Sequence, residues 1–549
     1  MNGLMMDVPL STAAIIRRAR LMHPGKAIVS RKPDKTIYRT SYGECIDRAA
    51  KLASALRRLG VRPGDRVGTL AWNHWRHLEA YFAIPSSGAV LHTLNLRLHP
   101  DDIAFICNHA EDKVVLIDKV LWPLWEKVAP RVKVTHTIVM SDDGEVPPGT
   151  LDYERLIADE PSAEEFADVP EHLAASMCYT SGTTGKPKGV VYSHRSMVLH
   201  AIGLALTDSF RLGESDTVLP VVPMFHVNAW GLPFICALAG CVQVHPGPHL
   251  DPGSLLELLA SEKVTLTAGV PTIWLGILQK LDSAPKAYDL SNLRTMVVGG
   301  SAAPESMMRG FKDRHGLNIL HAWGMTETSP LGSISRLTSE LEQADEATQW
   351  AYRAKQGRPA PLVEIRARGE HGIIPWDGTS MGELEVRGPW VAASYYNTTE
   401  GASSFTDDGW FRTGDIVSID LHGYITIQDR AKDLVKSGGE WISSVALEGA
   451  LMGHPAVAEA AVIAVPHAKW DERPFAVVVL KEGAVAEARD LRTFLMDKFA
   501  KWWIPDEVVI VAAIPKTSAG KFLKSALREQ FKDQYGQADP SARGKEQPA

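Results

Sequence analysis

The sequence predicts an α/β protein with a large N-terminal domain of parallel-rich sheets and helices, a small β-barrel subdomain, and a smaller, mobile α+β C-terminal domain. Three observations support this prediction: alternating apolar and amphipathic runs, a β-rich stretch further along the chain, and a second mixed pattern near the end. The chain has 549 residues. At roughly 150 residues per folding unit, this length suggests about three or four units.

The large domain is expected to span residues 1–430. In its first part, short apolar runs such as Arg66 to Trp72 are followed by longer amphipathic ones such as His77 to Ile84. This alternation predicts strand–helix–strand units and mainly parallel sheets. From about Gly382 the pattern changes to short β-rich pieces, GELEVRGPWV and GYITIQDR, which predict a barrel or antiparallel subdomain at about 350–430.

The C-terminal domain is expected to span residues 431–549. Val462 to Val465 and Val508 to Val511 are predicted strands, and Ser444 to Met452 and Asp490 to Phe499 are predicted helices. The junction between the domains, DRAKDLVKSGGEW, is polar, charged and contains glycine. Such a composition is typical of a hinge, so we expect the C-terminal domain to move as a lid.

Composition argues against several other classes of protein. The net charge is −7, and no long Lys/Arg run offers a nucleic-acid surface. No apolar stretch reaches the roughly 18 residues of a transmembrane segment. The five cysteines are scattered and form neither a CxxC pair nor a zinc pattern with histidine. They are therefore expected to be reduced core thiols of a cytoplasmic protein.

The most informative segment is YTSGTTGKPKGV, from Tyr179 to Val190. Its glycines permit tight turns, and its hydroxyls and lysines suit a polyphosphate. It is not a Walker A loop, which needs four residues between its glycines, because only two separate Gly182 from Gly185. Loops of this composition are also common as ordinary surface turns. The candidate phosphate-binding residues are Thr180, Ser181, Gly182, Thr183, Thr184, Gly185 and Lys188.

This loop resembles the phosphate loop of the adenylate-forming superfamily of acyl-CoA synthetases, luciferases and peptide-synthetase adenylation domains. Together with four further segments that match the superfamily in order, it covers the chain from about residue 175 to 525. The surroundings VPMFHVNAWGLP, VGGSAAP and KSGGEWIS are most similar to bacterial medium- or long-chain fatty acyl-CoA synthetases and to ligases for 3-methylmercaptopropionate. The four segments are WGMTE (Trp323 to Glu327), WFRTGD (Trp410 to Asp415), DRAKD (Asp429 to Asp433) and PKTSAGK (Pro515 to Lys521).

The resemblance implies an acid–thiol ligase that makes an acyl-adenylate from a carboxylic acid and ATP, then an acyl-CoA with release of AMP. Attack of one anion on another makes charge neutralisation by cations, Mg²⁺ and backbone donors the main catalytic task. The expected substrate is a medium- or long-chain fatty acid, with 3-methylmercaptopropionate as an alternative. An adenylating enzyme with another acceptor and a nucleotide-binding protein without turnover are further alternatives. Similar enzymes are commonly dimers, so a homodimer is compatible with the family.

The nucleotide contacts implied by the resemblance begin with Thr326, which would hydrogen-bond the α-phosphate. Glu327, with Thr180, would hold Mg²⁺, because this hard cation prefers oxygen ligands. Asp415 would accept from the ribose hydroxyls, and Arg430 would donate to the same sugar. Trp323 would stack on the adenine, where the superfamily more often has tyrosine. The other nucleotide-binding candidates are Gly300, Ser301, Ala302, Ala303, Ala322, Gly324, Met325 and Lys436.

Lys521 is the lysine that, in the superfamily, bridges the attacking carboxylate and the α-phosphate. Lys516 and Lys524 are nearby competitors for this role. Rotation about the hinge residue Lys432 would withdraw Lys521 and present another face for the thiol step. Coenzyme A would then bind in a tunnel whose candidate residues are Gly438, Gly439, Glu440 and Trp441.

The acyl site is expected around MFHVNAW. His226 and Trp230 are four residues apart and would project from one side of a helix start. The resemblance implies that Trp230 gates the acyl tunnel and that His226 lines the site near the carboxylate, with Val227 and Gly231 beside them. Such His/Trp pairs are also common in ordinary core packing. The following stretch, GLPFICALAGC, is small and apolar, as an alkyl or thioether substrate requires.

Overall fold

The structure is a computed structural model that describes residues 1, 3–161, 166–180, 186–437, 440–467, 469–517 and 521–534. The predicted phosphate-loop residues Ser181 to Gly185 and the predicted coenzyme A residues Gly438 and Gly439 lie outside these ranges. The chain forms two compact units. Unit 1 consists of Met1–Ser301, Gly310–Ile365 and Val386–Arg412, and unit 2 of Ala302–Arg309, Arg366–Glu385 and Thr413–Ala549.

Unit 1 contains a nine-stranded sheet whose central strands are parallel, as the alternating pattern predicted. Antiparallel pairing occurs toward its two edges, between β1 and β2 and among β14, β15 and β16. In order across the sheet the strands are β16 (Arg358–Pro359), β15 (Leu331–Ile334), β14 (Ile319–Gly324), β13 (Thr295–Val298), β12 (Leu266–Gly269), β10 (Thr217–Pro220), β11 (Val242–His245), β1 (Ala27–Arg31) and β2 (Ile37–Ser41).

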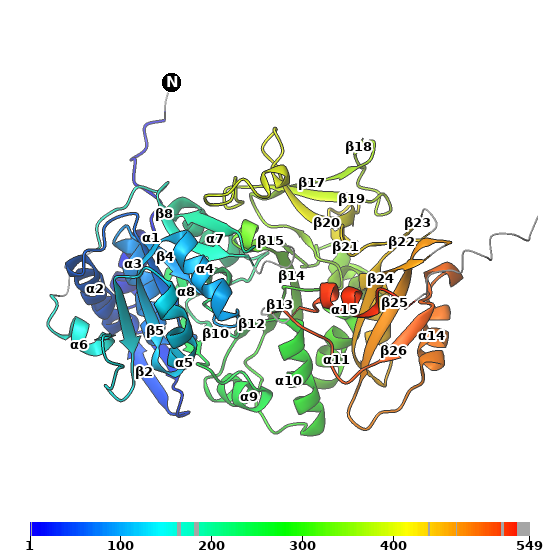
Figure 1. The fold of residues 1–549 in the computed structure, drawn as a ribbon, viewed down its shortest axis with the longest axis horizontal. Helices are drawn as coiled ribbons and strands as arrows, with labels where there is room; N and C mark the ends of the chain where they lie inside the picture. Colours follow the sequence, from blue (N-terminus) through cyan, green and yellow to red (C-terminus); the bar gives the residue numbers. More distant parts are fainter. Residues whose placement is uncertain are drawn as a thin grey trace, which may run out of the picture. The chain divides into compact units, whose positions relative to one another are not determined.

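Several helices accompany this sheet, and three of them, α1, α7 and α8, pack against one another (Figure 1). Helix α8 is buried along most of its length because its residues are almost all apolar. The bounds are α1 (Thr12–Met22), α7 (His194–Ala205), α8 (Leu232–Ala239), α9 (Pro252–Ser261), α10 (Pro271–Ser283), α11 (Glu305–His315) and α12 (Glu346–Arg353).

A seven-stranded sheet forms the other layer of unit 1, and it is parallel except for the β8–β9 hairpin. That hairpin ends one strand at Tyr179 and begins the next at Gly189, so the predicted phosphate loop is its connection. The strands in order are β7 (Leu151–Asp152), β6 (His136–Met140), β5 (Asp112–Asp118), β3 (Arg66–Leu70), β4 (Val90–Thr93), β8 (Ala174–Tyr179) and β9 (Gly189–Ser193).

Helices α3 to α6 follow strands of this sheet, whereas α2 follows β2 of the nine-stranded sheet and begins with a clear capping signal. Before α2, the Ser41 side chain accepts from the Glu44 backbone N–H, and the Glu44 carboxylate accepts from the Ser41 N–H. This reciprocal capping box satisfies two backbone donors that a helix start leaves unpaired. The bounds are α2 (Tyr42–Arg58), α3 (Trp75–Ser86), α4 (Pro100–Ala110), α5 (Trp122–Val128) and α6 (Tyr153–Ala158).

The predicted β-rich subdomain is a five-stranded sheet. Its hairpins β17–β18 and β20–β21 are antiparallel, and the second brings Asp415 and Arg430 directly opposite each other. The strands in order are β18 (Gly372–Ile373), β17 (Glu364–Gly369), β19 (Gly382–Arg387), β20 (Phe411–Ile419) and β21 (Ile425–Arg430).

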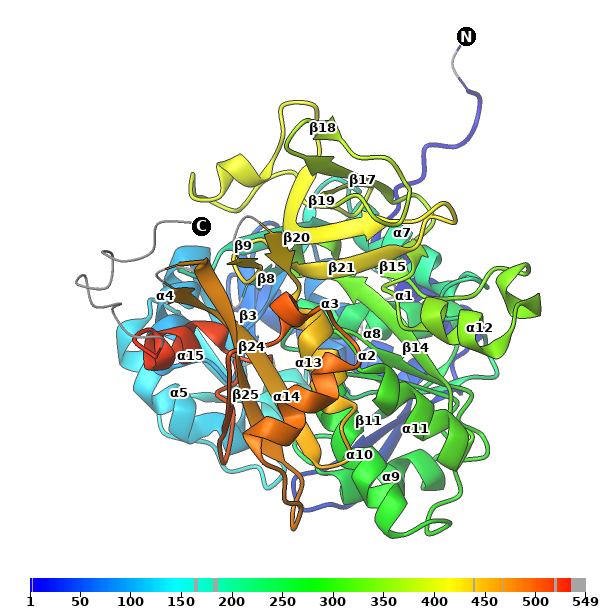
Figure 2. The same ribbon diagram turned by 90° about the vertical axis from the view of Figure 1, so that its right-hand side faces the viewer.

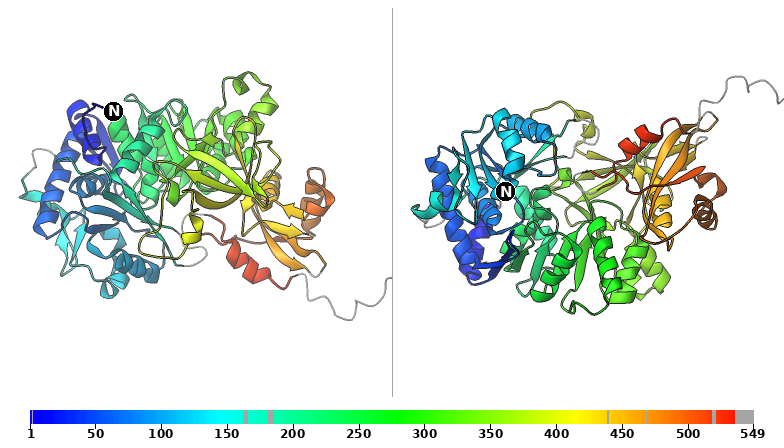
Figure 3. Two further views of the ribbon diagram at one scale, coloured as in Figure 1. Left: turned by 90° about the horizontal axis from the view of Figure 1, so that it is seen from above. Right: turned by 60° about the horizontal axis from the view of Figure 1, so that its bottom comes forward.

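The C-terminal part of unit 2 is a second sheet with helices on both faces. Alternate residues of β24 and β25 point to opposite sides, as in any strand. One side packs against α13 and α14, which lie together in Figure 2. The other side packs against α15, which lies across the strands from α14 in Figure 3. The elements are β23 (Glu440–Ile442), β22 (Val435–Ser437), β25 (Asp471–Leu480), β24 (Val457–His467), β26 (Glu507–Ile510), α13 (Ser444–Met452), α14 (Ala488–Met496) and α15 (Lys524–Phe531).

The α/β class and the small α+β module are therefore confirmed, and the division of the chain at residue 430 stays a prediction. All five cysteines are free and buried. None of the helices in the described part of the chain combines the length and the apolar character that a membrane crossing requires.

Candidate active site

The two ends of the predicted phosphate loop are held together by a pair of hydrogen bonds. The Thr180 N–H donates to the Lys188 carbonyl at 2.9 Å, and the Thr180 hydroxyl accepts from the Lys188 N–H at 3.1 Å. The Lys188 ammonium lies 5.0 Å from the centre of the Tyr395 ring, and the Lys186 ammonium lies 5.4 Å from that of Phe105. The two ends of the loop are therefore held together, and Lys186 and Lys188 lie at the end where the chain rejoins the hairpin.

Thr326 and Glu327 form a single 3-10 turn, η4 (Thr326–Thr328), that several unit 1 groups fix in place. The Tyr395 hydroxyl donates to Glu327 Oε1 at 2.7 Å, and the Tyr192 hydroxyl donates to the Thr326 carbonyl at 2.8 Å. Both predicted residues are buried. Burial, together with the negative charge of Glu327, raises the pKa of Tyr395 well above its ordinary value, so this phenol remains a neutral donor.

Tyr395 was not predicted as a site residue. It belongs to none of the matching motifs and lies 68 residues from Glu327 in the sequence. Its ring also lies beneath Lys188, so one tyrosine touches both the phosphate-loop base and the candidate metal ligand. Among the described residues, no other side chain hydrogen-bonds the Glu327 carboxylate. Its second oxygen is therefore compatible with a hard cation, which usually binds through one or two carboxylates plus phosphate.

The predicted adenine site lies at the carboxyl end of β13, where two consecutive glycines suit the close packing and the backbone conformation. A Cβ on Gly299 would lie 3.0 Å from the Ala322 carbonyl and 3.0 Å from the Trp230 ring, and Gly300 has a φ of +86°. Ala322 and Gly324 belong to β14, and Met325 follows it. Gly300 and Ser301 belong to unit 1, whereas Ala302 and Ala303 belong to unit 2.

Trp323 packs against the backbone of the neighbouring strand β15. A Cβ on Gly332 would lie 2.2 Å from the Trp323 ring, which explains the glycine there. The side chain is buried, with 8% of the residue exposed. Stacking of this indole on adenine stays a prediction.

The predicted ribose ligands are joined to each other in unit 2. Arg430 Nε lies 2.9 Å from Asp415 Oδ1, and Arg430 Nη1 donates to the Thr413 carbonyl at 2.9 Å. Asp415 is 2% exposed and sits directly across the hairpin from Arg430. The arginine thus holds a buried carboxylate in one orientation, and its acceptance from the ribose hydroxyls stays a prediction.

The predicted helix start that would align His226 and Trp230 is wrong. The segment is a left-handed turn, η3 (Val227–Gly231), in which Val227, Asn228, Ala229 and Trp230 all have φ between 45° and 57°. The spacing rule of four residues assumes a right-handed helix, so it does not apply here. Each left-handed non-glycine residue costs about 1–2 kcal/mol, and a β-branched valine is especially unfavourable.

Tertiary contacts compensate for this strain, and Asn228 makes the central one. Its Oδ1 lies 3.0 Å from the Ser176 hydroxyl on β8 and 3.4 Å from the Tyr81 hydroxyl on α3. The Tyr81 hydroxyl also donates to the Met224 carbonyl. At the other end of the turn, Trp230 lies on Gly299. Asparagine tolerates the left-handed region better than most residues, and this was the only signal in the sequence.

Lys521 lies at the end of a closed loop in unit 2. Its N–H donates to the Thr517 hydroxyl at 3.1 Å, and the Thr517 N–H donates to the Lys521 carbonyl at 2.7 Å. Both competing lysines are engaged elsewhere: Lys516 pairs with Glu459 at 2.5 Å, and Lys524 pairs with Glu448 at 2.7 Å. The predicted coenzyme A residue Trp441 is half-exposed beneath Lys436, whose ammonium lies 4.8 Å from the ring centre.

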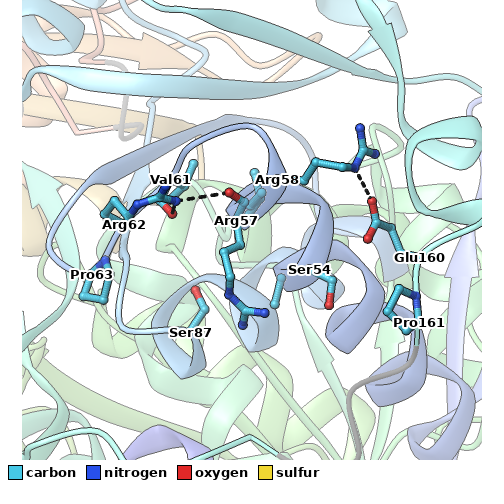
Figure 4. Close-up of a pocket in the computed structure, with 11 residues that line it drawn as sticks. Ser54, Arg57, Arg58, Val61, Arg62, Pro63, Ser87, Glu160 and Pro161 are labelled. Atoms are coloured by element: carbon cyan, nitrogen blue, oxygen red, sulfur yellow. Dashed lines mark hydrogen bonds and ion pairs between the residues drawn. The ribbon is translucent and has the colours of Figure 1, made fainter.

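A surface pocket of about 590 Å³ lies away from these residues, at the end of α2. Figure 4 shows Arg57, Arg58 and Arg62 around it, with Arg58 paired to Glu160 at 2.6 Å. None of the predicted site residues lines it. Basic side chains at a helix C-terminus complement the carbonyls there, which accounts for this cluster without a ligand.

Buried histidines predict that the protein loses stability in mild acid. Burial lowers the pKa of His77, His200 and His245 to about 3 and of His194 and His321 to about 4, from an ordinary 6.5. At pH values between these lowered pKa values and 6.5, the histidines bind protons in the unfolded chain but not in the folded chain. Each histidine then removes up to about 1.4 kcal/mol of unfolding free energy per pH unit as the pH falls.

We expect the thermal midpoint to fall by about 5 °C or more between pH 7.5 and pH 5.5, because a change of 1 kcal/mol shifts large domains by about 2–4 °C. Glu79 and Glu448 oppose this trend, because burial raises their pKa values and the folded chain therefore takes up their protons before the unfolded chain does as the pH falls. In the described structure neither ring nitrogen of His245 has a hydrogen-bond partner, so His245→Leu should reduce the pH dependence. A midpoint that is constant over this range would contradict the expectation.

Comparison with known proteins shows the family of this chain. Residues 16–396 match the model of the AMP-binding enzymes, and residues 446–521 match that of the AMP-binding enzyme C-terminal domain. The chain is 51% identical to a long-chain-fatty-acid–CoA ligase of Thermus thermophilus, over 97% of this chain and 98% of that one. It is 44% identical to a 3-methylmercaptopropionyl-CoA ligase of Ruegeria lacuscaerulensis, over 97% and 99%.

Solved structures agree. The anthranilate CoA ligase AuaEII in complex with anthranoyl-AMP superimposes with a TM-score of 0.85 at 27% identity, over 95% of this chain and 98% of that one. ATP-bound MatB from Rhodopseudomonas palustris gives a TM-score of 0.81 at 28% identity, over 96% and 100%. The chain belongs to the AMP-binding enzymes, as an AMP-forming acyl-CoA ligase. It uses ATP and coenzyme A, and its reaction passes through an acyl-adenylate.

Proposed function

We propose that this ligase activates a medium- or long-chain fatty acid. The main support is the identity with the Thermus thermophilus ligase, which exceeds that with the 3-methylmercaptopropionyl-CoA ligases. A medium-chain-fatty-acid–CoA ligase of Ectopseudomonas oleovorans is also 43% identical over 97% of this chain. The buried, apolar helix α8 directly after the left-handed turn suits an alkyl chain.

Within this proposal, the acyl chain passes Trp230. The indole lies on Gly299, at the end of β13 where the adenine is expected, so an acid seated beside it would present its carboxylate toward the nucleotide. His226, Val227 and Gly231 belong to the same turn or adjoin it. The second candidate, 3-methylmercaptopropionate, is supported by relatives at 44% and 43% identity.

The test is a panel of acids, from propionate and 3-methylmercaptopropionate to octanoate and palmitate, scored by coenzyme A-dependent AMP formation. Each buried methylene contributes about 0.8 kcal/mol, so octanoate should exceed propionate in kcat/KM by about 10²-fold or more. A preference for 3-methylmercaptopropionate over octanoate would overturn the choice of a fatty acid. The thioether acid thus serves as the matched short competitor.

The roles of the nucleotide ligands are part of the proposal. Thr326 would hydrogen-bond the α-phosphate, and Glu327 with Thr180 would hold Mg²⁺, which supplies charge neutralisation at the phosphates. Asp415 would accept from the ribose hydroxyls while Arg430 orients it, in keeping with their ion pair. The closed base of the phosphate loop supports its assignment, because it fixes the positions where Lys188 and Thr180 leave the hairpin.

The C-terminal module would supply Lys521 to the first half-reaction. Lys516 and Lys524 are less suited to this role, because their ammonium groups are paired with Glu459 and Glu448. Rotation about Lys432 would then bring Gly438, Gly439, Glu440 and Trp441 to coenzyme A. We also propose a cytoplasmic location, which the five free, buried cysteines support. A homodimer stays an expectation from the family.

A further inference from the structure

Helix α15 carries two basic side chains, one of which reaches Asp433 beside the hinge and the other of which reaches α13. The inference drawn from them rests on the proposed function, in which Lys521 serves adenylation and Lys432 is the hinge. Lys521 lies three residues before α15 begins at Lys524. Whatever fixes α15 therefore also fixes the base of the loop that holds Lys521.

The first connection is an ion pair between Arg528 and Asp433, the residue after the hinge lysine. Arg528 Nη1 lies 2.6 Å from Asp433 Oδ1, and the two side chains are 29% and 11% exposed. The Asp433 N–H donates to the Arg430 carbonyl at 2.9 Å. On the other side of Lys432, Arg430 is paired with Asp415 of β20. The residues on the two sides of Lys432 thus have different partners within unit 2: Arg430 pairs with Asp415 of the β-rich sheet, and Asp433 pairs with Arg528 of α15.

The second connection is buried. Lys524 Nζ lies 2.7 Å from Glu448 and donates to the Ser444 hydroxyl at 2.5 Å, both on α13. The Glu448 carboxylate also accepts from the Val462 N–H of β24 at 2.8 Å. Burial alone would lower the pKa of Lys524, but the charges of Glu448 and Asp429 raise it, so the ammonium stays charged.

The lysine loop and α15 form one piece. The Leu523 N–H donates to the Pro515 carbonyl at 2.8 Å, and the Thr517 N–H donates to the Lys521 carbonyl at 2.7 Å, so the loop closes on itself just before the helix. Leu527 then anchors the helix in the core against β24 and β25. A shift of α15 would consequently move the Lys521 backbone with it.

We propose that Arg528 and Lys524 are positioning residues for adenylation: they fasten the Lys521 loop to Asp433 and to α13, so that hinge rotation carries Lys521 to one fixed place. In this role neither side chain would touch the reactants. A misplacement of about 1 Å in a reacting group can lower a rate by about 10²-fold. Transfer from a finished acyl-adenylate to coenzyme A does not use Lys521 and should be insensitive to the same change.

The experiment measures the two half-reactions separately in the full-length enzyme. Arg528→Gln should lower acid-dependent ATP–pyrophosphate exchange by about 10- to 100-fold. Transfer from presynthesised octanoyl-adenylate to coenzyme A should stay within about two-fold of the parent rate, since that step does not depend on the lysine. The matched control is Lys532→Gln, which removes an exposed pair with Glu529 at the end of the same helix and should change neither half-reaction.

A double variant with reversed charges distinguishes a positioning role of the ion pair from a role in folding. Asp433→Arg combined with Arg528→Asp should restore most of the lost exchange activity, because the pair is re-formed with its charges reversed. The proposal is overturned if Arg528→Gln retains full ATP–pyrophosphate exchange. It is also overturned if both half-reactions fall together and the charge-reversed double variant restores neither. Full exchange activity in Lys521→Ala would instead refute the lysine assignment, so the two failures are distinguishable.

Discussion

Lys521→Ala should lower acid-dependent ATP–pyrophosphate exchange by about 10²–10³-fold, the usual cost of deleting one preorganised donor that faces developing charge. The ammonium would bridge two anions that otherwise repel each other, so its loss is felt in the transition state more than in the bound substrates. ATP affinity, measured by calorimetry, should change little. Transfer from presynthesised acyl-adenylate to coenzyme A should also survive, because adenylation is already complete.

Lys516→Ala is the control for this experiment. It lies in the same loop and removes the same charge, but its ammonium is paired with Glu459 at 2.5 Å. We expect exchange within about three-fold of the parent enzyme, since half-exposed surface pairs contribute little. Exchange that persists in Lys521→Ala, or that is lost equally in Lys516→Ala, would show that the adenylating cation lies elsewhere.

Glu327→Gln should reduce kcat by about 10²-fold and raise the Mg²⁺ concentration needed for half-maximal rate, because a carboxamide is a much weaker ligand for a hard cation. Glutamine has nearly the same size and can still accept from the Tyr395 hydroxyl, so the η4 turn should keep its shape. The measurement is a titration of Mg²⁺ at saturating ATP and acid. Extra Mg²⁺ should recover part of the activity.

Tyr395→Phe provides the comparison. It removes the 2.7 Å hydrogen bond to Glu327 but leaves the carboxyl group in place and keeps an aromatic ring beneath Lys188. We expect a loss of about ten-fold or less, corresponding to one hydrogen bond to a charged group. If Glu327→Gln were as active as the parent at limiting Mg²⁺, the metal-ligand assignment would be wrong.

Local patterns in the sequence predicted much of the fold. Helix α13 has the bounds expected for Ser444 to Met452, and β3 begins at Arg66 as expected. These elements carry their signal in residue spacing and flanking polar groups. The predicted phosphate loop was located from its composition, and in the structure it connects the two strands of the β8–β9 hairpin.

What the sequence did not reveal depends on contacts between distant residues. The left-handed turn at Val227 is held by Ser176 and Tyr81, neither of which is near it in the chain. Tyr395 acts on Glu327 from outside every motif. The pairing of Arg528 with Asp433 joins residues 95 positions apart. Spacing rules describe single elements and carry no information about such partners.

The unusual backbone at Val227 to Trp230 also bears on how this enzyme can diverge. A glycine at one of these positions would suit the backbone better and would raise stability in isolation, yet it would free the segment that places the indole. In the proposed acyl site, selection for stability and selection for a defined range of acids would therefore act in opposite directions on these four residues. Variants that accept a different range of carboxylic acids should arise from substitutions at these positions. They should discriminate less between acids and should also be more stable to heat.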